Sequence, residues 1–139
     1  QMKLAVNGTP FPIDDRRGIP KMIFKGTLEH FSEDTLARFR RRMCGSSGQT
    51  EEFLSRTPTR TAEELREELA ALAQGITAYG SSSFIWDRAI IGNRDKIFPP
   101  RNQHEAWQGT EIMETEAEHY ETSLFSRLLE GKGEEWTRH

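Results

Sequence analysis

The segment from Thr61 to Gly80 carries the clearest structural pattern in this sequence. Thr61 and Glu64 have the spacing of a capping box, in which each side chain satisfies a free N–H group at the start of a helix. Leucine, alanine and isoleucine residues then recur at helical spacing, which puts them on one face. The pattern predicts a helix over 62–79, and its apolar face requires a second layer of structure to cover it.

Other helix signals are present on both sides of this segment. Ser32 is a good N-cap and Gly45 is a typical helix stop, so a helix is expected between them. The glycine- and serine-rich stretch 45–50 predicts a flexible loop. A last helix is expected from about 104 or 110 to 130, while the apolar stretch 84–91 is compatible with either a helix or a strand.

The first 25 residues indicate β structure. Residues 4–6 precede Asn7-Gly8, the commonest two-residue hairpin turn, and 9–13 would form a return strand that its two prolines confine to an edge. Residues 21–25 are a third candidate strand. The predicted fold class is therefore α+β, with a short N-terminal β-hairpin or three-strand element followed by three to four packed helices. One domain is expected over 1–139, divided into a β element at 1–25, a mainly helical part at 32–130 and a flexible tail at 131–139.

The composition excludes several classes of protein. The 139 residues include 19 basic and 22 acidic ones. This net negative charge rules out a strongly basic nucleic-acid protein. Cys44 is the single cysteine, which rules out an intramolecular disulfide and a cysteine-based zinc cluster within one chain. There is no apolar run of the length that spans a membrane and no signal-peptide core. We predict a cytoplasmic protein with no membrane partner and no cofactor.

Four arginines within five residues form the most conspicuous cluster of charge. Guanidinium groups match phosphate oxygens in pairs, and the adjacent serines could add donors, so a small phosphorylated ligand is one interpretation: a nucleotide, a second messenger or RNA. The alternative is structural, because cations at the end of a helix complement its dipole and can pair with the glutamates of the next helix. The candidate ligand-binding residues are Arg38, Arg40, Arg41, Arg42, Ser46 and Ser47.

Charge is unevenly distributed along the chain. Residues 1–60 carry 11 basic and 7 acidic side chains, whereas residues 61–139 carry 8 basic and 15 acidic ones. Such polarity favours docking between copies of the chain, and exposed aromatic residues would supply the buried centre of the contact. The candidate interface residues are Trp107, Phe98, Glu63, Glu64, Glu67 and Glu68. We predict a homo-oligomer, with another protein or a small anion as further partners.

Sequence motifs for catalysis are absent. There is no P-loop, no GxGxxG and no Gly-x-Ser-x-Gly, and Cys44 lacks the neighbours of a nucleophilic cysteine, so it is interpreted as an inert thiol. The Glu116-x-x-His119 pair alone does not make a metal site. If the protein were an enzyme, His104, Glu105, Glu116 and His119 would be the acid–base candidates. The leading hypothesis is a non-enzymatic, self-associating binding protein without a catalytic or metal site; the alternative is the phosphorylated-ligand protein.

Overall fold

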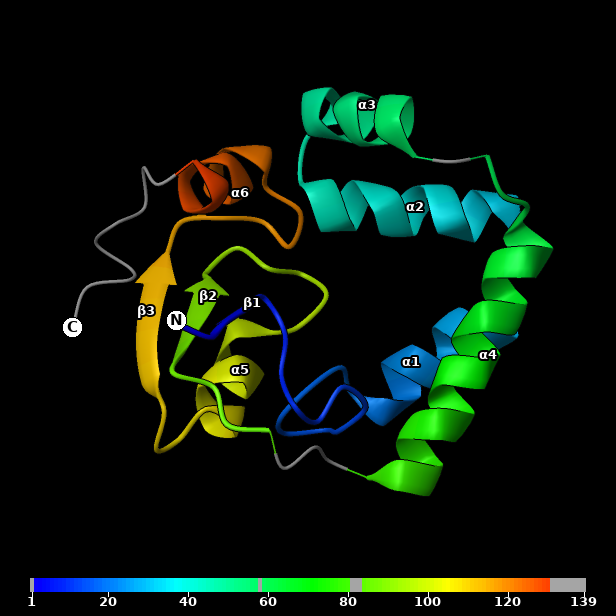
Figure 1. The fold of residues 1–139 in the computed structure, drawn as a ribbon. Helices are drawn as coiled ribbons and strands as arrows, with labels where there is room; N and C mark the ends of the chain where they lie inside the picture. The colour runs from blue at the N-terminus through cyan, green and yellow to red at the C-terminus, as the bar shows by residue number, and fades with distance from the viewer. Residues whose placement is uncertain (1, 58, 81–83, 131–139) are drawn as a thin grey trace.

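The fold is built on a three-stranded parallel sheet with β2 in the centre (Figure 1). The structure is a computed structural model that describes residues 2–57, 59–80 and 84–130. The strands are β1 (Leu4–Val6), β2 (Arg88–Gly92) and β3 (Glu111–Thr115), and Ala89 of β2 lies opposite Ala5 and Ile112. All five residues of β2 are buried, as expected of a central strand that is covered on both faces. The mixed helix-and-sheet class is confirmed.

Short helices cover both faces of the sheet. On one face, Ile90 packs with Leu124 and Leu128 of α6 (Thr122–Leu129). On the other face, Ala89 and Ile91 pack against Trp107, the residue that follows α5 (Pro100–Ala106). The core of the protein is therefore this small sheet between α5 and α6.

Four helices between β1 and β2 form a helical lobe beside the sheet (Figure 1). They are α1 (Lys21–Glu29), α2 (Glu33–Cys44), α3 (Ser47–Arg56) and α4 (Ala62–Tyr79). The predicted bounds of α2 and α4 are confirmed. The oxygens of Ser32 and Thr61 cap the two helices by accepting the backbone N–H groups three residues later. Within residues 2–57, 59–80 and 84–130, no helix is long and apolar enough to cross a membrane.

The predicted N-terminal hairpin is wrong. After β1 the N–H of Asn7 donates to the carbonyl of Ile90 at 3.0 Å, so the chain continues along β2 instead of turning back. The prolines in 9–13 remove the donors that a return strand would need, whereas β2 offers a complete ladder. Residues 21–25 belong to α1, which begins directly after Pro20, and the carboxylate of Asp15 accepts the free N–H of its first residue, Lys21, at 2.9 Å. The glycine–serine loop at 45–50 is likewise mostly helix α3.

The second half is less helical than predicted. The range 32–130 contains β2 and β3, and the expected helix from 104 or 110 to 130 is interrupted by β3. Gly109 has a φ of +88°, which ends helical structure after α5 and starts the turn into β3. The predicted tail at 131–139 lies outside the described residues, and the single-domain organisation stays a prediction.

Candidate active site

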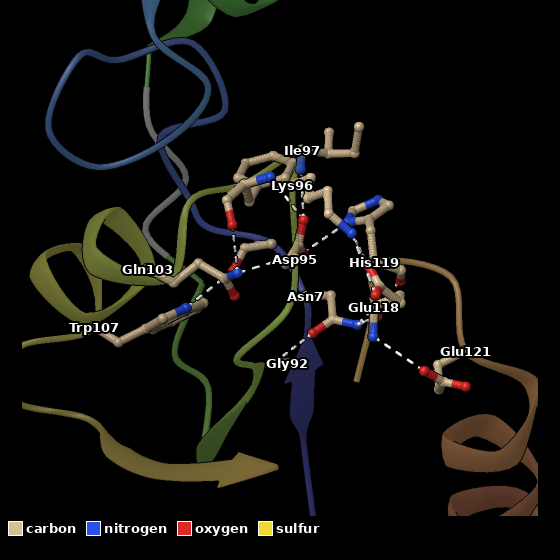
Figure 2. Close-up of polar contacts among 12 residues, drawn as sticks. Asn7, Gly92, Asp95, Lys96, Ile97, Gln103, Trp107, Glu118, His119 and Glu121 are labelled. Carbon is tan, nitrogen blue, oxygen red and sulfur yellow. Dashed lines mark hydrogen bonds and ion pairs between the residues drawn. The ribbon is translucent and has the colours of Figure 1, made fainter. Parts of the chain in front are cut away.

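Two polar side chains meet where β2 and β3 end. Asp95 follows β2 and His119 follows β3, and because parallel strands end at the same edge of a sheet, the two loops are neighbours. Nδ1 of His119 lies 2.8 Å from Oδ2 of Asp95 (Figure 2). The Asp95 side chain is fully buried and that of His119 is 25% exposed, so only the histidine is accessible to a substrate.

The carboxylate of Asp95 is held by its own loop. Its Oδ1 accepts the backbone N–H groups of Ile97 at 2.8 Å and Phe98 at 2.9 Å. The buried amide of Gln103 points at Oδ2 from 3.4 Å and also donates to the carbonyl of Phe98 at 2.9 Å. These contacts leave Oδ2 aimed at the imidazole of His119.

The tautomer of His119 follows from its partner. An ionised carboxylate can only accept, so the hydrogen bond to Asp95 requires the proton on Nδ1, and Nε2 of the neutral ring then carries a lone pair. No residue of the described part of the chain hydrogen-bonds to Nε2. The ring of Phe98 is stacked on the imidazole, with centroids 5.9 Å apart and planes 15° apart. The hydrogen bond to Asp95 and the stacking on Phe98 fix the orientation of the imidazole, which can therefore act as a base.

The loop that carries His119 is tied to the helical lobe. Glu118, the residue before His119, forms an ion pair at 3.0 Å with Lys96, the residue after Asp95. The two loops are therefore joined at two neighbouring positions. The backbone N–H of Tyr120 donates to the carbonyl of Met43 near the end of α2 at 2.9 Å. The histidine loop therefore rests on both the β2 loop and α2.

An apolar cavity lies in the helical lobe, and Lys96 and Ile97 of the Asp95 loop form part of its wall. It has a volume of about 650 Å³, and its walls come from α1, α2, α4 and the loop after β2. Ile23, Phe24, Phe39 and Leu69 supply apolar surface, and Ile97 is two residues from Asp95. A space with mostly apolar walls can take up an apolar group.

The arginine cluster lies along α2 in the helical lobe, and Arg42 is one of the residues that line the apolar cavity. Arg38, Arg41 and Arg42 are exposed, and Arg40 is half-buried with its guanidinium 6.0 Å from the ring centre of Phe53. The hydroxyl of Ser46 caps α3 by accepting the N–H of Gln49, and Ser47 is the exposed first residue of that helix. Glu63, Glu64, Glu67 and Glu68 are exposed on α4, and Glu64 and Glu68 pair with Arg60. A binding role for these residues stays a prediction, as do the homo-oligomer and the other partners.

The predicted exposed aromatic contact is wrong for Trp107. Its side chain is buried, with 4% of the residue exposed, and Nε1 donates to the carbonyl of Gly8 at 2.9 Å. Its polar neighbours in the sequence suggested a surface position, but the end of α5 turns the ring under the sheet. Phe98 is half-buried and contacts the ring of His119.

Neither Cys44 nor His104 belongs to the site formed by His119 and Asp95. Cys44 is fully buried, and burial raises the pKa of its thiol, so it remains protonated and unreactive, in agreement with the sequence-based interpretation. His104 forms an exposed pair with Glu114 at 2.9 Å. Within residues 2–57, 59–80 and 84–130, no group of three or more metal-ligating side chains comes together.

A comparison with protein families assigns the chain. Residues 1–130 match the model of the family described as pimeloyl-ACP methyl esterase BioG. This chain belongs to the BioG family. The finding overturns the hypothesis of a non-enzymatic assembly protein and its phosphorylated-ligand alternative, because the family is one of enzymes.

One similar solved structure carries the same family name, and two similar proteins carry other descriptions. A BioG crystal structure from Haemophilus influenzae is 42% identical with a TM-score of 0.81, and the match covers 88% of this chain and 58% of that one. An uncharacterised protein of Haemophilus influenzae is 44% identical over 88% of this chain and 57% of its own length. A malonyl-[acyl-carrier protein] O-methyltransferase of Bacteroides fragilis is 48% identical over 93% of this chain and 27% of its own length. The chain thus spans a little more than half of the length of the two H. influenzae proteins and about a quarter of the length of the B. fragilis protein.

Sequence reasoning found one member of the pair and missed the other. His119 was among the acid–base candidates, but Asp95 was not, because the two residues are 24 positions apart and form no motif. A usable signal was the position of Asp95: it follows the buried Ala89–Ile91 run, and polar residues just beyond a parallel strand are frequent in active sites.

Proposed function

We propose that this chain carries the acid–base pair of a carboxylic ester hydrolase that acts on the methyl ester of an acyl group bound to an acyl carrier protein. The observation that supports the proposal is the 2.8 Å contact between His119 and a fully buried aspartate at the ends of two parallel strands. Histidine–carboxylate pairs of this kind serve acyl-transfer enzymes of several unrelated folds.

In this mechanism His119 moves the proton. Its Nε2 accepts a proton from the attacking hydroxyl group and later donates it to the departing alkoxide, which leaves as methanol. Asp95 keeps the other ring nitrogen protonated and stabilises the imidazolium that forms between the two steps. The loss of methanol leaves the acyl group as an ester on the attacking hydroxyl. Water then attacks this ester, Nε2 of His119 takes the proton of the water and returns it to the released hydroxyl, and the products overall are a free carboxylic acid and methanol.

The attacking hydroxyl is proposed to come from outside the described residues. Cys44 is buried with a protonated thiol, and Nε2 of His119 has no hydrogen-bond partner among residues 2–57, 59–80 and 84–130. The H. influenzae BioG chain extends well beyond the match, with 58% of it covered. The proposed division places the base in this chain and leaves the nucleophile to the part of the protein that corresponds to the unmatched segment.

The apolar cavity supports an acyl substrate. A space of about 650 Å³ lined by aliphatic and aromatic side chains takes an aliphatic chain out of water, with a favourable free energy of about 0.8 kcal/mol for each buried CH₂ group. Lys96 and Ile97, which follow Asp95 in the same loop, line one wall of the cavity, so we place the acyl chain in the cavity and its ester toward His119. The B. fragilis relative carries a methyltransferase name, but the match covers 27% of that protein, so ester hydrolysis is the better supported activity here. The lone buried thiol of Cys44 supports a cytoplasmic location for this reaction.

The test uses full-length protein expressed from its gene, with pimeloyl-ACP methyl ester as the probe. Hydrolysis lowers the mass of the carrier-bound acyl group by one CH₂, which mass spectrometry detects. His119→Gln should abolish turnover. His104→Gln is the matched control, because His104 also contacts a carboxylate at 2.9 Å but lies on the surface. Equal activity of the wild type and His119→Gln would refute the proposal.

A further inference from the structure

Asn7 occupies the point where the three strands end. It follows β1 directly and is buried, with 5% of the residue exposed. Its Oδ1 accepts the backbone N–H of Gly92, the last residue of β2, at 2.8 Å. Its Nδ2 donates to the carbonyl oxygens of Glu118 at 3.2 Å and His119 at 3.0 Å (Figure 2). One side chain thus joins the ends of β1 and β2 to the histidine loop.

The two acceptors define which residue is held. The carbonyl groups of Glu118 and His119 lie before and after the α-carbon of His119, so the amide of Asn7 fixes the backbone of the base on both sides. The side chain of His119 contacts Asp95 and the ring of Phe98. The other backbone and ion-pair contacts of this loop involve its neighbours: Glu118 pairs with Lys96 and donates its N–H to Glu121, and the N–H of Tyr120 donates to the carbonyl of Met43. Among the described residues, Asn7 alone hydrogen-bonds to the carbonyl of His119.

The backbone around Asn7 fits this task. Asn7 has a φ of +51°, in the left-handed region that asparagine adopts more readily than most residues. Opposite it, a Cβ on Gly92 would come within 2.6 Å of the carbonyl oxygen of Ala117 and 3.0 Å of Oδ1 of Asn7. The missing side chain of Gly92 lets the amide insert between the end of β2 and residues 117–119.

We propose that Asn7 is a positioning residue for His119: its amide sets the distance between the histidine loop and the end of β2 at which Nδ1 of His119 reaches Asp95. The catalytic part of this inference rests on the proposed function. The structural part, the dependence of the His119–Asp95 hydrogen bond on Asn7, does not.

Asn102 provides a matched control. It is also buried, with 4% of the residue exposed, and its Nδ2 donates to two carbonyl oxygens, those of Asp15 at 3.0 Å and Gly18 at 2.8 Å. It has no contact with the histidine loop among the described residues. Asn7→Gly keeps the left-handed backbone and removes the amide, whereas Asn102→Ala removes an equivalent amide elsewhere.

The first readout is the Nδ1 proton of His119 in the NMR spectrum, where a proton shared with a carboxylate resonates far downfield. We expect this signal in the wild type and in Asn102→Ala, and its loss in Asn7→Gly at a temperature at which all three remain folded. Asn7→Asp keeps an oxygen that accepts the N–H of Gly92, but it replaces the NH₂ group that donates to Glu118 and His119. This variant should also lose the Nδ1 proton signal. Persistence of the signal in Asn7→Gly, its absence from the wild type, or equal loss in Asn102→Ala would each overturn the proposal. Failure of both Asn7 variants to fold while Asn102→Ala folds would also overturn it, because Asn7 would then serve global stability.

The second readout is hydrolysis by the full-length protein. Asn7→Gly should lower kcat by about 100-fold with little change in KM, because a misplaced base slows the chemical step without weakening substrate binding. A raised KM with unchanged kcat would contradict the positioning role. If the wild type hydrolyses no ester, the proposed function fails, and the NMR comparison still decides whether Asn7 holds His119.

Discussion

Replacing Asp95 with asparagine changes one oxygen of the site to an NH₂ group, and the structure dictates which one. Oδ1 accepts two backbone N–H groups, from Ile97 at 2.8 Å and Phe98 at 2.9 Å. An NH₂ group cannot accept, so the amide oxygen must stay at the Oδ1 position and the NH₂ group must face His119. Two donors would then meet across the 2.8 Å contact.

The histidine resolves this conflict by changing its tautomer. With an NH₂ group opposite, Nδ1 must present its lone pair, and the ring proton moves to Nε2. A protonated Nε2 cannot take the proton of the attacking hydroxyl. The corresponding change in serine proteases lowers kcat by about 10⁴-fold. We expect a similar loss here, which corresponds to roughly 5 kcal/mol of transition-state stabilisation.

The assay measures kcat for ester hydrolysis and, by ¹⁵N NMR, the tautomer of His119. Asp14→Asn is the matched control, because Oδ1 of Asp14 also accepts two backbone N–H groups, from Arg16 and Arg17, and Oδ2 contacts the Arg17 side chain. The control should retain the wild-type tautomer and turnover. If Asp95→Asn lowered kcat no more than Asp14→Asn does, or left the proton on Nδ1, the assignment of Asp95 as the orienting group would be wrong.

Two further predictions concern the interior of the protein. Because burial raises the pKa of the Cys44 thiol, iodoacetamide should label it much more slowly in the native protein at pH 8 than in urea, and equal rates would contradict its burial. Gly92→Ala would place a Cβ 2.6 Å from the carbonyl oxygen of Ala117, and the displacement of backbone should lower the free energy of unfolding by about 1–3 kcal/mol. Urea denaturation measures this change, and an unchanged midpoint would show that the junction has room for a methyl group.

Local signals allowed the sequence to predict parts of the helical lobe. The starts of α2 and α4 were correct because the caps at Ser32 and Thr61 act within three residues of the helix start, and their ends were correct because Gly45 and Gly80 stop the helices. The N-terminal segment was misread because Asn7-Gly8 is a hairpin signal only when the following residues can pair with the preceding strand. Here β1 pairs with β2, whose residues lie more than 80 positions away: the side chain of Asn7 bonds to Gly92 across 85 positions.

The sequence by itself determined the local and compositional properties of this protein: the two capped helices, the α+β class, the single inert thiol and the absence of a long apolar run. Only the tertiary structure decided the site. It placed Asp95 beside His119, turned Trp107 into the core and brought Asn7 under the histidine loop. The physical reason is range: caps depend on hydrogen bonds between near neighbours, whereas the site depends on parallel strand pairing, which joins residues that share no local pattern.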